Sequence, residues 1–340
     1  MRICVVGAGA IGGYMVVRLA AAGHDVSVIA RGPHLDAIRT NGLKLIEADG
    51  GAEQVATNLV ATDRLADLEP QDIVLLALKA HQIQAVVGDL PRLFGSDTVM
   101  VTLQNGIPWW YFQKLGGEYA NSVVRTVDPD GVLSTRIDPD RLIGCIAYPA
   151  AAVAEPGVVR HIEGNRFPVG ELDGTETERV RMVSEVFTEA GFKSRILDDI
   201  RSEIWLKLWG NLTFNPISAL THSTLVDICQ FPLTRELAAT MMTEASTVAE
   251  RLGASFRVPM ERRIAGAEAV GKHKTSMLQD VEAGKPLEID GMLGVVVELA
   301  ETTGVEVPTL RALYACASLL NATIQNEGIR VKGTPKRRGT

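Results

Sequence analysis

Hydrophobic residues are distributed differently in the two halves of the chain. In the first half they form short continuous runs, such as residues 74–78 and 98–103, and glycine-containing or polar segments separate them. Runs of this length are typical of strands buried on both faces of a parallel sheet. After Ile204 the pattern changes to long helical stretches with almost no strand signal. We therefore predict an α/β fold with a parallel-sheet domain over residues 1–197 and an all-helical domain over residues 198–340.

The first apolar run leads directly into a glycine-rich turn and then into a helical pattern. This turn reads Gly7, Ala8, Gly9, Ala10, Ile11, Gly12 and has the spacing G-x-G-x-x-G. In this context Gly7 permits the tight turn, Gly9 lets backbone N–H groups approach a pyrophosphate, and Gly12 lets the helix pack against the strand. The phosphates would lie at the positive end of the helix. The turn predicts a Rossmann-type dinucleotide-binding domain, and a purely structural glycine turn is the alternative.

The residue after the second strand-like run indicates which dinucleotide is bound. An NAD-preferring site usually carries Asp or Glu there, where it accepts a hydrogen bond from the ribose 2′-hydroxyl. This chain has Arg31 at that place. A guanidinium pairs with a 2′-phosphate and gains nothing from a 2′-hydroxyl. We therefore predict NADP (NADPH) as the cofactor, and the alternative is a solvent-exposed arginine that follows a strand.

Two polar residues follow later strand-like runs. Lys79 comes directly after residues 74–78, and Asn105 follows residues 98–103. Residues just past the carboxyl ends of parallel strands face the ligand crevice of an open α/β sheet. Lys79 and Asn105 are therefore candidates for cofactor contacts, although each could also be an ordinary loop residue. Further along, residues 128–141 are rich in Asp, Pro and Gly, which predicts a loop.

One helical stretch of the second half carries a polar stripe. Lys207, Asn211 and Asn215 recur at i, i+4 and i+8, so they share one face of a helix whose other residues are strongly apolar. Such a stripe costs stability unless it is paired or lines a cleft. Pro216 disfavours helical geometry at Asn215 and predicts that the helix bends or ends there. The alternative is a lysine that reaches solvent and two asparagines that satisfy backbone groups.

The composition of the chain limits the classes of partner that it can be expected to bind. The formal net charge is −7, so the chain offers no overall field that would attract nucleic acid or an anionic membrane. Four cysteines stand singly among apolar neighbours, which predicts buried thiols in a reducing compartment and gives no sign of a metal site. There is no signal-peptide pattern and no apolar stretch long enough to span a membrane. We expect a cytoplasmic protein that acts on a small molecule.

Together these residues resemble the ketopantoate reductase family, which combines a Rossmann domain with an all-helical domain and reduces 2-dehydropantoate with NADPH. Two further segments, residues 276–280 and 288–290, fit the resemblance, although by themselves Ser276 and Glu288 have purely structural interpretations. The matching positions are Gly7, Gly9, Gly12, Arg31, residues 78–80 and 104–106, Lys207, Asn211, Asn215, Pro216, and residues 276–280 and 288–290.

On the substrate side, the resemblance implies that Lys207 is the proton donor and that Asn211 and Asn215 hold the substrate together with Asn105. It further implies that Ser276 hydrogen-bonds the carboxylate end of the substrate.

On the cofactor side, the resemblance implies that Arg31 and Lys79 meet the 2′-phosphate and that Asn105 and Ala150 lie along the cofactor. Glu288 would be the second catalytic residue, placed where cofactor and substrate meet, and would accept a hydrogen bond from a hydroxyl. The family resemblance leaves the assembly open, and a homodimer is the candidate.

Three departures from the family pattern concern the substrate. Leu293 stands where the family usually has Asn, Leu225 stands where some members offer a polar contact, and the segment 128–141 is longer than expected. A pocket with fewer polar groups should accept a less polar 2-oxo acid. A reductase for such an acid is therefore one alternative, and a non-catalytic NADP-sensing module is another. A related hydroxyacid dehydrogenase that used NAD would be expected to carry an acidic residue in place of Arg31.

Overall fold

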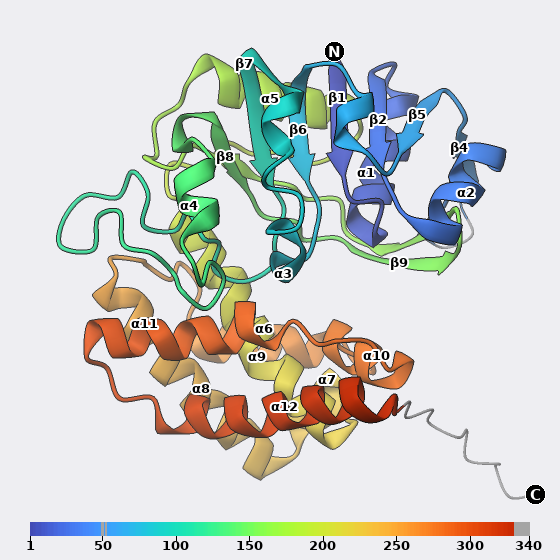
Figure 1. The fold of residues 1–340 in the computed structure, drawn as a ribbon. Coiled ribbons are helices and arrows are strands. Elements are labelled where there is room, and N and C mark those ends of the chain that lie inside the picture. Colours follow the sequence, from blue (N-terminus) through green and yellow to red (C-terminus); the bar gives the residue numbers. More distant parts are fainter. Residues whose placement is uncertain (49–50, 52, 330–340) are drawn as a thin grey trace, which may run out of the picture. The chain divides into compact units, whose positions relative to one another are not determined.

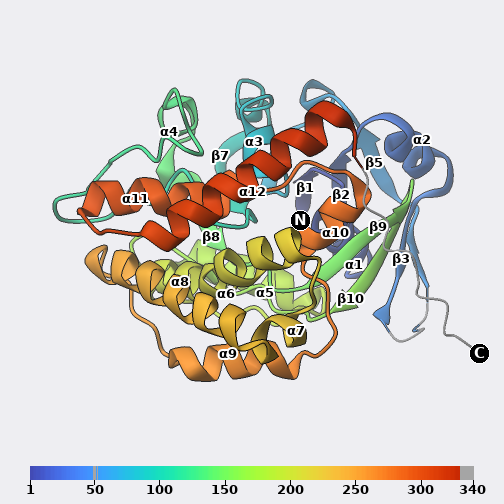
Figure 2. The same cartoon turned by 90° about the horizontal axis from the view of Figure 1, so that it is seen from below.

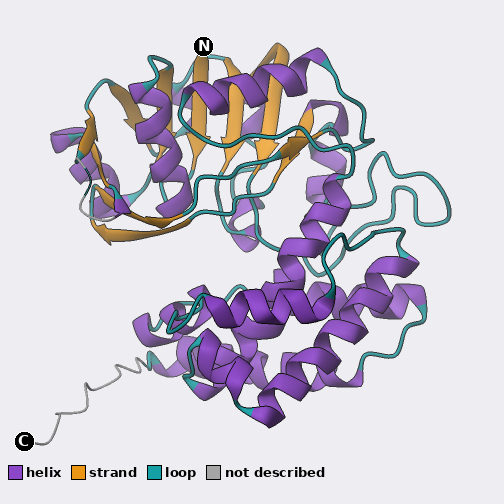
Figure 3. Ribbon diagram, turned by 180° about the vertical axis from the view of Figure 1, so that it is seen from behind, coloured by secondary structure: helices purple, strands orange, loops and turns teal. Residues whose placement is uncertain are grey.

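The computed structural model describes residues 1–48, 51 and 53–329 of the chain. They form two compact units, which are described separately. Unit 1 comprises Met1–Val124 and Asp128–Glu203, and unit 2 comprises Arg125–Val127 and the chain from Ile204 onward. The predicted α/β class is confirmed, because unit 1 contains a largely parallel sheet and unit 2 is built of helices (Figure 3). The division falls inside one helix, α6, whereas the sequence analysis placed a domain boundary at residue 197.

A seven-stranded sheet forms the centre of unit 1 (Figure 1). Its strands, in spatial order, are β11 (Val169–Gly170), β8 (Leu142–Cys145), β7 (Phe94–Thr102), β6 (Gln71–Leu76), β1 (Arg2–Val6), β2 (Asp25–Ile29) and β5 (Leu59–Thr62). Neighbouring strands are parallel, except that β11 runs antiparallel to β8. The apolar runs predicted to be strands lie in β1, β2, β6 and β7, and their residues are buried because the strands lie between covered faces.

The order of the strands reverses at β1. From β1 the chain first builds outward through β2 to β5, and it then returns to the other side of β1 to form β6, β7 and β8. In the register, Val5 pairs with Val28 of β2 and with Leu75 of β6, so the three strands end together. Open α/β sheets bind ligands beyond the carboxyl ends of their strands at such a reversal. The loops after β1 and β6 are therefore the candidate binding loops.

Helices and a second sheet complete unit 1. The helices are α1 (Ala10–Ala21), α2 (Gly32–Asn41), α3 (Ala80–Ile83), α4 (Val132–Arg136) and α5 (Glu178–Glu189). The second sheet has the order β4 (Gln54–Ala56), β3 (Leu43–Ile46), β10 (Val158–Glu163) and β9 (Ala150–Glu155), and it packs against α1. Gly13 permits this contact, because a Cβ there would lie 2.6 Å from Cγ2 of Val159.

The segment 128–141 is not a plain loop, so that prediction is wrong. It contains α4 and a 3₁₀ turn, Pro139–Arg141. The cause is Asp128, which is 2% exposed. Its carboxylate accepts hydrogen bonds from the backbone N–H groups of Leu133 and Ser134, at 2.9 and 2.8 Å, and from the Ser134 hydroxyl at 2.7 Å. A carboxylate at a helix N-terminus satisfies N–H groups that the helix cannot pair.

Unit 2 contains seven α-helices and one π-helical turn among its described residues. They are α6 (Ile200–Thr221, whose first residues belong to unit 1), α7 (Leu225–Gln230), α8 (Pro232–Arg251), α9 (Met260–Ala269), α10 (Ser276–Ala283), the π-turn Asp290–Gly294, α11 (Val295–Thr303) and α12 (Pro308–Glu327). Both α11 and α12 pack against α8 (Figure 2). The carboxylate of Glu244 in α8 accepts from the N–H groups of Thr309 and Leu310, which fixes the start of α12.

Two further expectations are corrected in the helices. Of the two outcomes expected at Asn215, a bend or an end of the helix, the end is wrong, because α6 continues through Pro216 and ends at Thr221. The burial of Leu212, Phe214 and Ile217 on this part of α6 offsets the cost of an interior proline. In addition, Cys316 on α12 is exposed, whereas Cys4, Cys145 and Cys229 are buried as predicted. Among the described residues, none of the helices is both long enough and apolar enough to cross a membrane.

Candidate active site

The glycine turn has the backbone conformation that its sequence predicts. Gly7 has φ of +112°, in a region that residues with a Cβ rarely adopt. The N–H groups of Gly7 and Ala8 both donate to the carbonyl oxygen of Ile29 at 3.1 Å, which joins the turn to the end of β2. Helix α1 then begins at Ala10, with Gly9 as its N-cap. The turn therefore places the N-terminus of α1 at the carboxyl end of the sheet.

The space around the glycines fits a dinucleotide. A Cβ on Gly12 would lie 1.9 Å from the carbonyl oxygen of Gly7, so only glycine permits this packing. A Cβ on Gly9, in contrast, would meet no protein atom within 4 Å. Within the described residues, no side chain caps the start of α1. The first N–H groups of α1 are therefore available to an anion, and the open surface at Gly9 lets a pyrophosphate approach them.

The structure brings the ends of β6 and β7 to the glycine turn. A Cβ on Gly7 would lie 2.9 Å from Cδ2 of Leu78, so the segment that leads to Lys79 lies beside the turn. The backbone N–H of Lys79 donates to Oε1 of Gln82 at 3.1 Å and starts α3. Gln104 connects the two strand ends, because its amide donates to the carbonyl oxygens of Leu76 and Leu78 at 2.7 and 3.3 Å.

Gln104 directly precedes Asn105, and its role was not apparent from the sequence. Its position in the segment 104–106 was the available signal. By fixing the end of β7 against the end of β6, Gln104 also fixes the backbone from which Asn105 projects.

Arg31 is exposed at the end of β2 and forms the N-cap of α2. In the part of the chain that the structure describes, its guanidinium is not in an ion pair with a carboxylate. A phosphate therefore would not have to compete with a protein anion for it. Ala150 is half-buried at the start of β9, where it pairs with Glu163 of β10. It belongs to the second sheet of unit 1, and no hydrogen bond described here ties it to the glycine turn.

In unit 2, the predicted polar stripe lies on one continuous helix. Lys207, Asn211 and Asn215 project from the same face of α6. Lys207 and Asn211 are half-buried, and Asn215 is 6% exposed. The neighbouring Trp205 and Trp209 are buried, so apolar packing holds this part of α6 in place.

Asn215 is poorly satisfied by the protein. Within the described residues its amide has one hydrogen-bond partner, the thioether sulfur of Met292 at 3.8 Å. Sulfur is a weak acceptor, and a primary amide offers two N–H donors and an acceptor oxygen. Buried amides in folded proteins are normally well paired. The amide of Asn215 therefore has unused hydrogen-bonding capacity that a polar ligand would fill.

Glu288 lies just before the π-turn and is half-buried. Met292, which contacts Asn215, belongs to that turn, so the structure links Glu288 to the polar face of α6 through a short stretch of chain. Met292 was missed from the sequence, where it reads as an ordinary apolar residue. Ser276 is the first residue of α10 and is exposed. The hydroxyl of its neighbour Thr275 accepts from the Leu278 N–H at 3.2 Å, so Thr275 caps α10 and Ser276 does not.

The residues that depart from the family pattern also have defined places. Leu293 is completely buried in the π-turn. Leu225 is the first residue of α7, and its N–H donates to the carbonyl oxygen of His273 at 3.1 Å.

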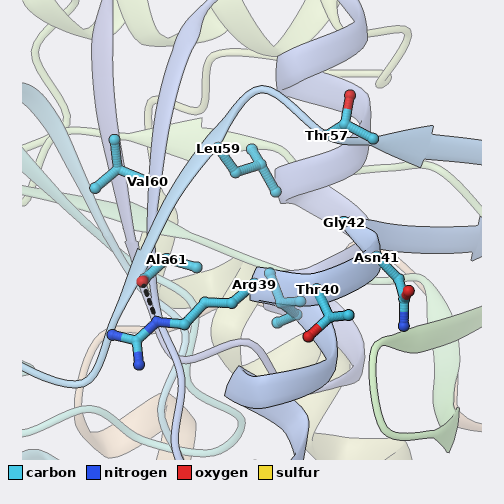
Figure 4. A pocket seen from close by; sticks show the side chains of 9 residues that line it. Arg39, Thr40, Asn41, Gly42, Thr57, Leu59, Val60 and Ala61 are labelled. Carbon is cyan, nitrogen blue, oxygen red and sulfur yellow. Dashed lines mark hydrogen bonds between the residues drawn. The ribbon is translucent and has the colours of Figure 1, made fainter.

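A separate hollow in unit 1 lies away from the predicted residues (Figure 4). It has a volume of about 480 Å³ between the end of α2 and β5 and is lined by residues 38–42, 57 and 59–61. The Arg39 Nε in its wall donates to the carbonyl oxygen of Ala61 at 3.0 Å. None of the predicted site residues lines this hollow, so it is not the candidate active site.

Comparison with known proteins gives consistent matches over both units. Residues 3–174 match the family "Ketopantoate reductase PanE/ApbA", and residues 199–321 match "Ketopantoate reductase PanE/ApbA C terminal". The chain is 49% identical to a 2-dehydropantoate 2-reductase of Mesorhizobium japonicum, with 93% of this chain and 96% of that protein covered.

Solved structures agree with these matches. A candidate ketopantoate reductase of Ralstonia solanacearum superposes with a TM-score of 0.90 at 36% identity, covering 95% of this chain and 98% of that one. A 2-dehydropantoate 2-reductase of Geobacter metallireducens gives a TM-score of 0.81 at 27% identity, covering 94% and 99%. D-mandelate dehydrogenase, in a ternary structure with NADH and anilino(oxo)acetate, is 21% identical with a TM-score of 0.81 over 96% and 100%, and it shares the fold.

Proposed function

The chain belongs to the ketopantoate reductase family, and from this premise we propose that it reduces a 2-oxo acid to the 2-hydroxy acid with NADPH, the substrate being 2-dehydropantoate and the product pantoate. The observation that carries the proposal is the polar face of α6. Lys207, Asn211 and Asn215 lie there on a helix held by buried apolar side chains, and the buried amide of Asn215 lacks a strong partner. A ketone that must be oriented and protonated needs such a face.

Unit 1 supplies the groups that would hold the cofactor. The N–H groups at the start of α1, in the turn of residues 7–12, would bind the pyrophosphate. Arg31 and Lys79 would pair with the 2′-phosphate, and Asn105 and Ala150 would lie along the cofactor. When bound, NADPH supplies the hydride for the ketone carbon.

Unit 2 supplies the proton and the orientation of the substrate. As the ketone carbon is reduced, negative charge develops on its oxygen, and the Lys207 ammonium stabilises that charge and donates the proton. General acid catalysis of this kind typically contributes roughly a hundred-fold to ten thousand-fold in rate. Asn211 and Asn215 would hold the substrate, Ser276 would donate to its carboxylate, and the Glu288 carboxylate would accept from a substrate hydroxyl.

We propose further that the enzyme works as a cytoplasmic homodimer without nucleic-acid or membrane partners. Sedimentation equilibrium of the purified chain tests the assembly, and a monomer at all concentrations would contradict it. Localisation of the tagged chain in its native host tests the compartment, and recovery outside the cytoplasm would contradict it.

The deciding experiment measures NADPH oxidation with 2-dehydropantoate and with a panel of branched and aromatic 2-oxo acids. The proposal expects the highest kcat/KM for 2-dehydropantoate and little turnover with NADH. A Lys207→Ala enzyme that still binds NADPH serves as the matched control for background oxidation. NADPH binding without turnover of any 2-oxo acid would contradict the proposal and would support the sensing module instead.

A less polar 2-oxo acid is the second candidate substrate. It is favoured by the apolar Met292 side chain on the polar face of α6, because the Met292 thioether contacts the Asn215 amide. A substrate hydroxyl that finds no partner in such surroundings lowers affinity. In the same panel, a branched or aromatic 2-oxo acid with a higher kcat/KM than 2-dehydropantoate would establish this alternative.

A further inference from the structure

Two side chains of α12 hold the short segment that carries Glu288. The backbone N–H of Leu287 donates to Oδ1 of Asn321 at 2.9 Å, and the hydroxyl of Tyr314 donates to Oδ1 of Asp290 at 2.7 Å. Tyr314 and Asn321 stand at i and i+7, so they lie on the same face of α12. Glu288 therefore lies between two points at which the chain is fixed to one helix.

The turn after Glu288 has an unusual backbone conformation and lies against Tyr314. Residues Asp290–Gly294 form a π-helical turn, a rare conformation that is frequent at functional sites. A Cβ on Gly294 would lie 2.8 Å from the Tyr314 hydroxyl oxygen, so glycine is what lets the tyrosine reach the turn. The glycine in the π-turn thus leaves the space that the Tyr314 hydroxyl occupies.

The same turn reaches the polar face of α6. Met292, inside the π-turn, contacts the amide of Asn215 at 3.8 Å. A shift of the turn would therefore move Glu288 at its start and also disturb the neighbour of Asn215. Tyr314 and Asn321 together are called the clamp here. The clamp sets the positions of Glu288 and Met292 relative to α12.

The Tyr314 hydroxyl carries a proton that it can donate, and the Asn321 side-chain oxygen is oriented by a neighbouring residue. Burial and the neighbouring Asp290 carboxylate raise the pKa of Tyr314 to about 12, so its hydroxyl keeps the proton that it donates. The side-chain amide of Gln325, one turn further along α12, donates to Oδ1 of Asn321 at 3.0 Å and orients that oxygen.

From these contacts we infer that Tyr314 and Asn321 are positioning residues, which hold Glu288 in the geometry that the reaction requires. The inference rests on the proposed function, in which Glu288 touches the substrate. Neither side chain was singled out by the sequence, and they act on the reaction through Glu288 and the π-turn.

The test compares Tyr314→Phe and Asn321→Ala with Glu288→Gln and with the control Thr323→Ala. Thr323 is also on α12, is half-buried, and its hydroxyl donates to the carbonyl of Leu319 in the same helix. Tyr314→Phe removes a single oxygen and keeps the ring, so it is informative even where Asn321→Ala does not fold. Each variant is measured for kcat, for the Kd of NADPH and for amide hydrogen exchange at Leu287.

Displacement of a catalytic group by a fraction of an ångström to one ångström costs on the order of ten-fold to a hundred-fold in rate. We therefore expect Tyr314→Phe and Asn321→Ala to lower kcat by about ten-fold, with the Kd of NADPH unchanged. Asn321→Ala should also speed exchange at Leu287, and Thr323→Ala should change nothing. In the Glu288→Gln background, Tyr314→Phe should lower kcat by less than it does in the parent protein, because part of its effect is transmitted through Glu288.

Two outcomes separate this inference from the proposed function. Normal kcat in Tyr314→Phe and Asn321→Ala, or a kcat loss that adds fully to that of Glu288→Gln, would overturn the positioning role and leave the proposed function standing. Normal turnover in Glu288→Gln itself would remove the proposed role of Glu288, and the inference would fall with it.

Discussion

The two units contribute different kinds of groups to the candidate site, mainly backbone groups in unit 1 and side chains in unit 2. In unit 1 the candidate cofactor region is shaped mainly by the backbone. Glycines, the N–H groups at the start of α1 and the ends of the strands form it. In unit 2 the candidate groups are side chains of α6 and α10 and of the segment before the π-turn. A site made of backbone is damaged by adding a Cβ, whereas a site made of side chains is damaged by removing one. The predictions that follow use this contrast.

The largest effect is expected from removing the Lys207 side chain. Lys207→Ala should lower kcat by roughly a hundred-fold or more, since the developing oxyanion loses its proton donor and a positive charge. Its Kd for NADPH should stay close to that of the parent protein, because the groups that bind phosphate lie in unit 1. Stopped-flow oxidation gives the rate, and a fluorescence titration with NADPH gives the Kd.

An equal loss of turnover and NADPH binding would assign Lys207 to the cofactor site and erase the contrast between the units. Normal turnover would make Glu288 the leading candidate for the acid.

In unit 1 a single added Cβ should have different effects on stability at two glycines. Gly12→Ala forces the new Cβ to within 1.9 Å of the Gly7 carbonyl oxygen, so it should destabilise unit 1 by about 1–3 kcal/mol and abolish NADPH binding. Gly9→Ala meets no protein atom within 4 Å, so the Tm should hardly change while NADPH binding weakens. Thermal unfolding and NADPH titration distinguish the two. Full NADPH affinity in Gly9→Ala would show that the pyrophosphate does not lie at this turn.

Arg31 is the exception in unit 1, a side chain on which cofactor choice should depend. Arg31→Ala removes a charge-assisted contact worth roughly 1.5–3 kcal/mol, so the KM for NADPH should rise by about ten-fold or more. The KM for NADH should change little, since NADH has no 2′-phosphate. Steady-state kinetics with both cofactors provide the measurement. An equal change for both would mean that Arg31 does not read the phosphate.

The smallest effect concerns pH and unit 1. The side chain of His24 is 8% exposed, and burial and the N-terminal ammonium hold its pKa below the ordinary value of 6.5, partly opposed by Glu189. The unfolded chain therefore binds a proton first as the pH falls through 6.5, and the free energy of unfolding decreases there until His24 also protonates in the folded state.

His24→Gln should flatten the pH dependence of stability between pH 7 and pH 5 by less than about 1 kcal/mol, as followed by urea unfolding. Lys207→Ala should show the same dependence of the unfolding free energy on pH as the parent protein. An unchanged slope in His24→Gln would place the acid sensitivity elsewhere.

Local pattern was sufficient for those parts of the protein whose structure depends on neighbours in sequence. Continuous apolar runs gave the strands that contain residues 74–76 and 98–102, the G-x-G-x-x-G spacing gave a turn with Gly7 at positive φ, and the i, i+4, i+8 spacing placed Lys207, Asn211 and Asn215 on one helix face. Strand and helix periodicity and glycine conformation are properties of a few consecutive residues, so they can be inferred before any tertiary contact is known.

Tertiary structure decided the rest, because those features depend on partners far away in the chain. Helix α6 continues through Pro216, where buried packing outweighs the local preference. The weak pairing of the Asn215 amide with Met292 and the clamp of Tyr314 and Asn321 on the segment around Glu288 join residues from different helices. Sequence order does not specify which side chains meet across such distances, since that is determined by how the helices pack.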